Sequence, residues 1–88
     1  MFYVYLLQCE TDENQFYIGS TKDLRKRLLS HNAGENNATK GHQWKLVYYE
    51  AYLNEQAARA REKRLKHHGK TKQALMIRIR EMLGFTQP

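Results

Sequence analysis

A phenol, a guanidinium and an imidazole lie within one short stretch of this sequence. Tyr17 belongs to a run of aromatic and β-branched residues that is typical of a strand, and an amphipathic helical pattern follows it. In that helix Leu24 and Leu28 form an apolar ridge, and Arg27 and His31, also four residues apart, lie along its border. A guanidinium binds anionic oxygens bidentately, and an imidazole or a phenol can transfer a proton. The spacing is compatible with a site for an anionic ligand beside the strand, but a buried strand tyrosine next to a solvated basic helix explains each part of the pattern equally well.

One carboxylate stands inside a strongly cationic segment. Residues 59–72 hold seven Lys or Arg residues and a single acid, Glu62. Ala58 precedes it by one helical turn and Leu65 follows it by three residues, which places Glu62 beside an apolar stripe. Two interpretations follow: a surface ion pair with Lys66 at i+4, worth about 0.3–0.5 kcal/mol, or a ligand for a hard divalent cation.

Length, charge and cysteine content restrict the class of protein. The 88 residues suffice for one domain, expected at 1–84, with a short tail at 85–88. With 15 Lys and Arg against 9 Asp and Glu, the net charge of +6 favours a polyanionic partner such as DNA, RNA or an anionic membrane. A membrane is the least favoured, because the apolar run Phe2–Leu7 is too short to span a bilayer and lacks the basic flank of a signal peptide. We therefore expect a cytoplasmic protein, in which the single Cys9 is a core residue rather than part of a disulfide or a CxxC metal site.

The hydrophobic patterns predict an α+β fold in the order β-β-α-β-α-α, with a small three-stranded antiparallel sheet flanked by three helices. The first strand, about 2–9, is apolar on both faces and is expected at the centre of the sheet. The other expected elements are a strand that ends near residue 19, a helix from about 24 to 31, a strand over 44–52, and helices over about 54–68 and 71–83.

The two C-terminal helices have recognisable ends in the sequence. Asn54 is expected to cap the start of the second helix, and Gly69 to end it. Leu75, Ile79 and Met82 recur at helical spacing, so they are expected to face the core from the third helix. The neighbouring His67 and His68 point about 100° apart on a helix and cannot chelate a metal together.

The hairpin between the first two strands decides whether Tyr5 and Tyr17 can form one site. Side chains directly opposite each other share a face, so the two phenols meet only if paired residue numbers sum to an even value. A tight turn between Asp12 and Glu13 would separate them. A common site therefore requires a longer loop or a bulge.

The segment 32–43 is rich in Gly, Asn, Ala and Thr, and its composition predicts a mobile loop. Lys40 and His42 lie in it and could touch a substrate, although solvation alone would explain both residues.

Five ordered motifs resemble one enzyme family. Tyr3-Val4-Tyr5 and Tyr17-Ile18-Gly19 resemble the two halves of the GIY-YIG nuclease signature. The small single-domain bacterial branch of that family is similar over roughly residues 2–80, and the motifs that carry the similarity are Gly19-Ser20-Thr21-Lys22-Asp23-Leu24 with Arg27, Val47-Tyr48-Tyr49-Glu50, and Arg61-Glu62-Lys63. The sequence departs from the family where Tyr3-Val4 replaces Gly-Ile, and where Ser20 stands in place of a Lys that several larger members carry, a role that Lys22 could take.

The resemblance implies a metal-dependent endonuclease that hydrolyses phosphodiester bonds in nucleic acid, DNA rather than RNA, in repair or recombination. It implies one divalent ion, Mg²⁺ or Mn²⁺, held by Glu62 as the metal ligand. The implied catalytic residues are Tyr5, Tyr17, Arg27, His31 and Glu62. The implied nucleic-acid-binding residues are Lys22, Arg25, Lys26, Arg61, Lys63, Arg64 and Lys66.

Several alternatives stay open at this point. Tyr17, Tyr5 or His31 could be the general base, because a phenol has a pKa of about 10 and needs nearby cations, whereas an imidazole titrates near about 6.5. A non-catalytic DNA- or RNA-binding module on a degenerate GIY-YIG fold would use the same basic helices, and a protein-interaction domain would use neither phosphate contacts nor metal. A protein partner could also direct so small a chain to its site.

Overall fold

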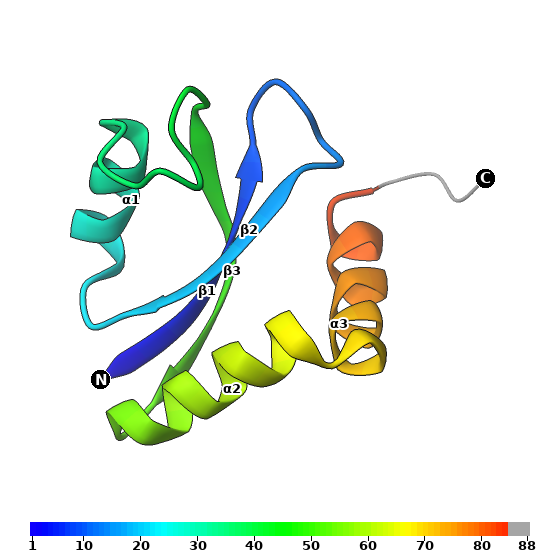
Figure 1. Ribbon diagram of the computed structural model, residues 1–88. Helices are drawn as coiled ribbons and strands as arrows, with labels where there is room; N and C mark the ends of the chain where they lie inside the picture. The colour runs from blue at the N-terminus through cyan, green and yellow to red at the C-terminus, as the bar shows by residue number, and fades with distance from the viewer. Residues whose placement is uncertain (85–88) are drawn as a thin grey trace.

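The computed structural model, which describes residues 1–84, confirms the predicted α+β fold (Figure 1). Three antiparallel strands form one sheet in the order β2-β1-β3, so the first strand is central as expected. The elements are β1 (Phe2–Cys9), β2 (Phe16–Thr21), α1 (Leu24–Asn32), β3 (Trp44–Tyr52), α2 (Glu55–His67) and α3 (Gly69–Met82). The expected tail at 85–88 lies outside the described residues. No helix within residues 1–84 has both the length and the apolar character needed to cross a membrane.

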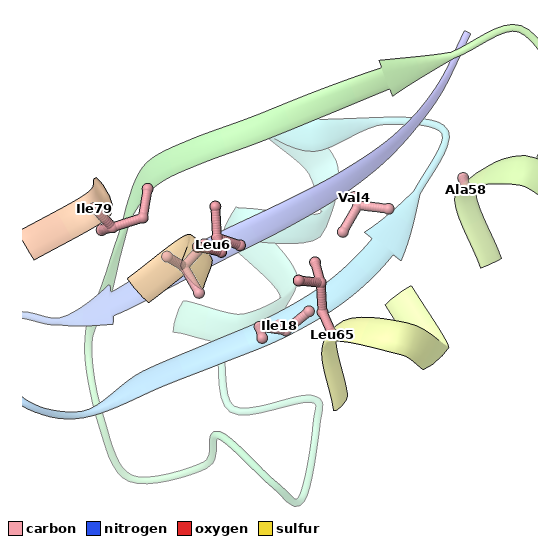
Figure 2. Packing of buried hydrophobic residues seen from close by; sticks show 7 residues of the cluster. Val4, Leu6, Ile18, Ala58, Leu65 and Ile79 are labelled. Carbon is pink, nitrogen blue, oxygen red and sulfur yellow. The ribbon is translucent and has the colours of Figure 1, made fainter. Parts of the chain in front are cut away.

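The helices cover the two faces of the sheet unequally, with α1 on one face and α2 and α3 on the other. The α2 and α3 side holds the larger core, shown in Figure 2. Its buried members are Val4, Leu6, Ile18, Ala58, Leu65, Leu75 and Ile79. On the other face Tyr5, Leu7, Cys9 and Trp44 are buried, and Leu24 and Leu28 of α1 pack against them. Each fully buried leucine or valine stabilises the fold by about 1.5–3 kcal/mol, so these contacts hold α1 and α2 in place on either side of β2.

The register of the hairpin brings the two phenols to one face. Tyr5 pairs with Gly19 and Leu7 pairs with Tyr17, so paired residue numbers sum to 24, an even value. The connection is longer than a tight turn: the Cys9 N–H donates to the Gln15 carbonyl over 2.9 Å, and residues 10–14 form the loop. The longer loop that a common site requires is therefore present.

Two details of the C-terminal helices differ from the expectation. Asn54 caps α2 as expected, accepting from the Ala57 N–H at 2.8 Å. However, α2 ends at His67 because His68 is extended (φ −115°, ψ 99°), and Gly69 begins α3 instead of ending α2. Met82 is 58% exposed. Leu75 and Ile79 of α3 are four positions apart, and Leu83, directly after the helix, continues this spacing and packs against the core where Met82 was expected.

The segment between α1 and β3 is anchored, whereas its composition predicted a mobile loop. The Asn32 side chain brackets the Trp44 backbone, accepting from its N–H at 2.7 Å and donating to its carbonyl at 3.0 Å. The Trp44 indole N–H donates to the Thr39 carbonyl at 3.0 Å, and Thr39 is fully buried. Lys40 and His42 are exposed on this segment. Its polar residues thus serve as hydrogen-bonding partners that hold the loop against the sheet.

Candidate active site

Tyr5 occupies the middle of the candidate site, on the sheet face that α1 covers. Its Oη lies 2.7 Å from Nε2 of His31, and both side chains are buried. Gly19, directly opposite on β2, makes this contact possible, because a Cβ at that position would lie 2.3 Å from the Tyr5 hydroxyl. The Tyr5 ring therefore extends across β2 toward α1 only because residue 19 has no side chain.

Tyr17 and His31 complete an aromatic cluster with Tyr5. The ring centroids of Tyr17 and His31 are 5.0 Å apart, and those of Tyr5 and Tyr17 are 6.5 Å apart. Tyr17 is half-buried, whereas Tyr5 and His31 are buried. The structure thus brings together three of the five candidate catalytic residues, from β1, β2 and α1.

Glu62 reaches the edge of β2 from α2. Its Oε1 accepts a hydrogen bond from Ser20 Oγ at 2.5 Å, and its Oε2 lies 2.7 Å from Lys66 Nζ. The same ammonium lies 5.5 Å from the centre of the Tyr17 ring, which connects the carboxylate to the aromatic cluster. Burial alone would raise the pKa of Glu62, but the hydrogen bonds from Lys66 and Ser20 outweigh it and lower that pKa. The predicted i+4 ion pair is confirmed, and its carboxylate is ionised at neutral pH beside the phenols.

Arg27, on α1, acts electrostatically on the buried pair. Burial is the main cause that lowers the pKa of His31, and the Arg27 cation lowers it further. Burial is also the main cause that raises the pKa of Tyr5; Tyr17 and Glu62 add to this rise and Arg27 opposes it. At neutral pH the imidazole is therefore neutral and the Tyr5 phenol protonated, so the imidazole is the better proton acceptor of the two.

Two open hollows meet at Ser20. The larger, of about 840 Å³, is lined by Ser20, Lys22, Lys26, Arg27 and Arg59, together with the acids Asp23, Glu35 and Glu55. The smaller, of about 440 Å³, is lined by Ser20, Arg59, Glu62, Lys63, Lys66 and His67. The smaller hollow is thus cationic except for Glu62, while the larger one carries mixed charge. Arg59, which borders both, was not among the candidate nucleic-acid-binding residues.

The seven cations predicted to bind nucleic acid divide into two groups. Those that are exposed and form no ion pair within the described chain are Lys22, Arg25, Lys26, Lys63 and Arg64. Arg61 and Lys66 are instead held by carboxylates. Arg61 donates to both oxygens of Glu50, at 2.9 and 3.0 Å, so its guanidinium is occupied within the protein.

Two residues of the site could not be found by pattern. Ser20 attracted notice only as a departure from the family motif, yet its hydroxyl holds Glu62. Thr39 gave no signal at all, because a threonine in a polar loop is ordinary; in the structure its Oγ1 lies 2.8 Å from His31 Nδ1.

The donor chemistry of the site suits a hard cation bound by few protein ligands. In residues 1–84 no group of three or more His, Cys, Asp or Glu side chains is arranged to hold a metal. The ionised Glu62 carboxylate accepts one hydrogen bond on each oxygen and keeps lone pairs on both. Mg²⁺ is commonly bound by one or two carboxylates, with water and substrate oxygens completing its shell. The residues present therefore fit a single divalent ion of that kind.

Comparison with known proteins places this geometry in a family. The sequence model of the GIY-YIG catalytic domain family matches residues 1–74, and the chain therefore belongs to the GIY-YIG family. It is 38% identical over 72 residues to a UPF0213 protein of Haloquadratum walsbyi, covering 80% of this chain and 79% of that protein. It is 37% identical over 62 residues to a UPF0213 protein of Streptococcus pyogenes serotype M5, covering 68% of this chain but only 65% of that protein. No solved structure matches the chain.

Family membership confirms the resemblance that the motifs indicated. A GIY-YIG catalytic domain implies nuclease-type chemistry on nucleic acid, and such nucleases generally depend on a divalent metal. The names of these two relatives state no activity.

Proposed function

We propose that this protein is an endonuclease that hydrolyses phosphodiester bonds in DNA with the help of one divalent cation, Mg²⁺ or Mn²⁺. The observation that carries the proposal is the position of Glu62: an ionised carboxylate that Ser20 and Lys66 hold at the edge of β2, beside Tyr17 and within a cationic hollow. A carboxylate in such a surface weakens binding to a polyanion, so a role in holding a cation explains its presence better than phosphate binding does.

In this proposal Glu62 holds the ion. When bound, the ion supplies Lewis-acid stabilisation of the negative charge that develops on the phosphoryl and leaving oxygens. Arg27 binds a non-bridging phosphate oxygen through its planar guanidinium, supported by its exposed position at the rim of the larger hollow. Tyr5 and His31 remove the proton of the attacking water, and the half-buried Tyr17 orients that water.

The surface cations supply affinity rather than chemistry. Lys22 and Lys26 line the larger hollow and Lys63 lines the smaller one, so these exposed cations can contact the phosphates that flank the one to be cleaved. Arg25 of α1 and Arg64 of α2 are also exposed and can add phosphate contacts. We leave Arg61 out of this set because Glu50 occupies its guanidinium. The net charge of +6 further supports a polyanionic substrate.

Three broader elements accompany this proposal. They are a role in DNA repair or recombination, a cytoplasmic location, and a protein partner that directs the chain to its site. The role and the location follow from the proposed class of activity. The partner follows from the shallow, open site, which offers few contacts for recognising a particular DNA sequence.

A second candidate is a non-catalytic module that binds DNA or RNA on the same fold. The observation in its favour is the ion pair between Lys66 and Glu62, which already neutralises the one carboxylate of the smaller hollow. This reading predicts binding to nucleic acid without cleavage and without a response to divalent metal.

Glu62→Gln distinguishes the two candidates. Wild type is expected to cleave at least one of a set of linear, nicked, branched and single-stranded DNA substrates in Mg²⁺ or Mn²⁺. The variant should lose this cleavage by about 10²–10³-fold or more, the scale seen when one stabiliser of transition-state charge is removed. Its affinity for the same DNA, measured in EDTA, should stay equal or rise because a negative charge leaves the surface. Glu81→Gln, an exposed position on α3, removes the same charge away from the site and should cleave like wild type.

Two results would count against the proposal. Equal metal-dependent cleavage by wild type and Glu62→Gln would show that the site is wrong. The wild-type protein could instead shift these substrates in a gel but cleave none of them in either metal. That result would establish the binding module.

A further inference from the structure

Three buried side chains form a continuous series of hydrogen bonds that begins at Tyr5, in the candidate site. Tyr5 Oη lies 2.7 Å from His31 Nε2, His31 Nδ1 lies 2.8 Å from Thr39 Oγ1, and Thr39 Oγ1 lies 3.4 Å from the Asn36 carbonyl oxygen. Tyr5, His31 and Thr39 are 3%, 1% and 0% exposed. They come from β1, α1 and the loop before β3, so only the tertiary fold brings these three side chains together.

The last acceptor decides the direction of the hydrogen bonds. A carbonyl oxygen can only accept, so the single hydroxyl proton of Thr39 is directed to Asn36. Thr39 Oγ1 must then accept from His31 Nδ1–H, which leaves Nε2 unprotonated to accept from the Tyr5 hydroxyl. Each of the three protons has an acceptor in this arrangement.

The reverse direction leaves one proton without a partner. If Thr39 donated to Nδ1, His31 would carry its proton on Nε2 and donate to Tyr5 Oη. The Tyr5 hydroxyl proton would then need a second acceptor, and the described residues provide none within hydrogen-bonding distance. A hydroxyl proton without a protein acceptor in a buried site is unfavourable, so the first arrangement, in which every proton has one, is favoured.

We propose that Thr39 is a positioning residue that holds His31 in the Nδ1–H tautomer, so that Nε2 takes the proton of Tyr5 during catalysis. This inference rests on the proposed nuclease function and names a residue outside the motifs that identify the family. In the proposed step the attacking water gives a proton to the Tyr5 oxygen as that oxygen passes its own proton to Nε2. The resulting imidazolium keeps Nδ1–H on Thr39, and it returns the added proton to solvent after the product leaves.

Thr39 is itself held rigidly enough for this role. Its backbone N–H donates to the Asn36 carbonyl at 3.1 Å, and its carbonyl accepts from the Trp44 indole at 3.0 Å. Trp44 is in turn bracketed by the side chain of Asn32, the last residue of α1. The hydroxyl therefore faces His31 from a fixed position.

The test is to determine the His31 tautomer by ¹⁵N NMR of the free protein, without nucleic acid or metal. Wild type and Thr39→Ser should show a pyrrole-type Nδ1 and a pyridine-type Nε2. Thr39→Val keeps the shape but removes the hydroxyl, so both ring nitrogens should move toward the averaged shifts of a tautomer mixture. Thr71→Val, on α3, makes the same replacement at a half-buried position away from the site and should leave the His31 shifts unchanged.

A cleavage assay on the same variants, with DNA and Mg²⁺ or Mn²⁺ added, separates positioning from simple packing. Thr39→Val should lower kcat by about 10²-fold, the lower end of what a positioned proton acceptor contributes, with DNA affinity unchanged and with activity restored in Thr39→Ser. An Nε2–H tautomer in wild type, or an unchanged Nδ1–H tautomer in Thr39→Val, would overturn the proposal. The wild-type measurement needs no variant, so it decides the direction of the hydrogen bonds between Tyr5, His31 and Thr39 even if Thr39→Val fails to fold. Because the tautomer is measured without substrate, its result is separate from any failure of the nuclease function.

Discussion

The Glu50 carboxylate at the β3–α2 contact gives a stability prediction whose size follows from its surroundings. Tyr48 and Tyr52 each donate a hydroxyl to it, and Arg61 binds both of its oxygens. The side chains of Arg61 and Glu50 are only 29% and 17% exposed. Burial alone would raise the pKa of Glu50, but the hydrogen bonds from Arg61, Tyr48 and Tyr52 outweigh it and lower that pKa from 4.5 to about 2.

Glu50→Gln should therefore destabilise the fold by about 3 kcal/mol at neutral pH. A pKa difference of about 2.5 between the unfolded and folded states corresponds to about 3 kcal/mol, at about 1.4 kcal/mol for each pKa unit. Because the folded-state pKa is the lower one, this stabilisation is fully present above pH 4.5 and is lost as the pH falls through about 2. The difference in unfolding free energy between wild type and Glu50→Gln should shrink over the same interval.

Urea denaturation at a series of pH values from 7 to 2 measures this difference. Glu55→Gln is the matched control, because its ion pair with Arg59 joins side chains that are 57% and 71% exposed. Such exposed i,i+4 pairs contribute only about 0.3–0.5 kcal/mol. A loss below about 1 kcal/mol in Glu50→Gln at pH 7, or a difference from wild type that does not change between pH 5 and 2, would refute the reasoning.

Two further predictions concern the site. Gly19→Ala should force the Tyr5 ring from its place, since the new Cβ would lie 2.3 Å from Oη, and it should cost about 1–3 kcal/mol in thermal unfolding as well as most of the cleavage. Gly69→Ala, where a Cβ meets nothing within 4 Å, should be neutral or stabilising, and equal melting temperatures for the two variants would contradict this account. Arg27→Ala should lower both DNA affinity and cleavage rate, the rate by about 10²–10³-fold, whereas Arg78→Ala, with the same change in charge on α3, should leave the cleavage rate unchanged. A gel shift and a single-turnover assay on both variants test this, and wild-type rates in Arg27→Ala would remove the residue from the site.

The sequence by itself determined the order and type of the helices and strands, and the family. Apolar residues on both faces of residues 2–9 require a central strand, and the Leu24 and Leu28 spacing requires a helix packed on one side, because burial of apolar surface follows the period of each element. The ordered motifs around Tyr17 and Glu62 were sufficient for the family, since they depend on residue types and spacing alone. The boundary at Gly69 was missed because the extended backbone of His68, not the glycine, ends α2.

Only the tertiary structure decided which polar groups of different elements meet. The hairpin register could have placed Tyr5 and Tyr17 on opposite faces, and the loop length that prevents this leaves no periodic signal in the sequence. Arg61 and Lys63 look equivalent along the chain, yet Glu50 engages only the first. Thr39 is the clearest case: its hydrogen bond to His31 joins residues of a loop and a helix in a dry interior, where each donor needs a partner that the local pattern does not reveal.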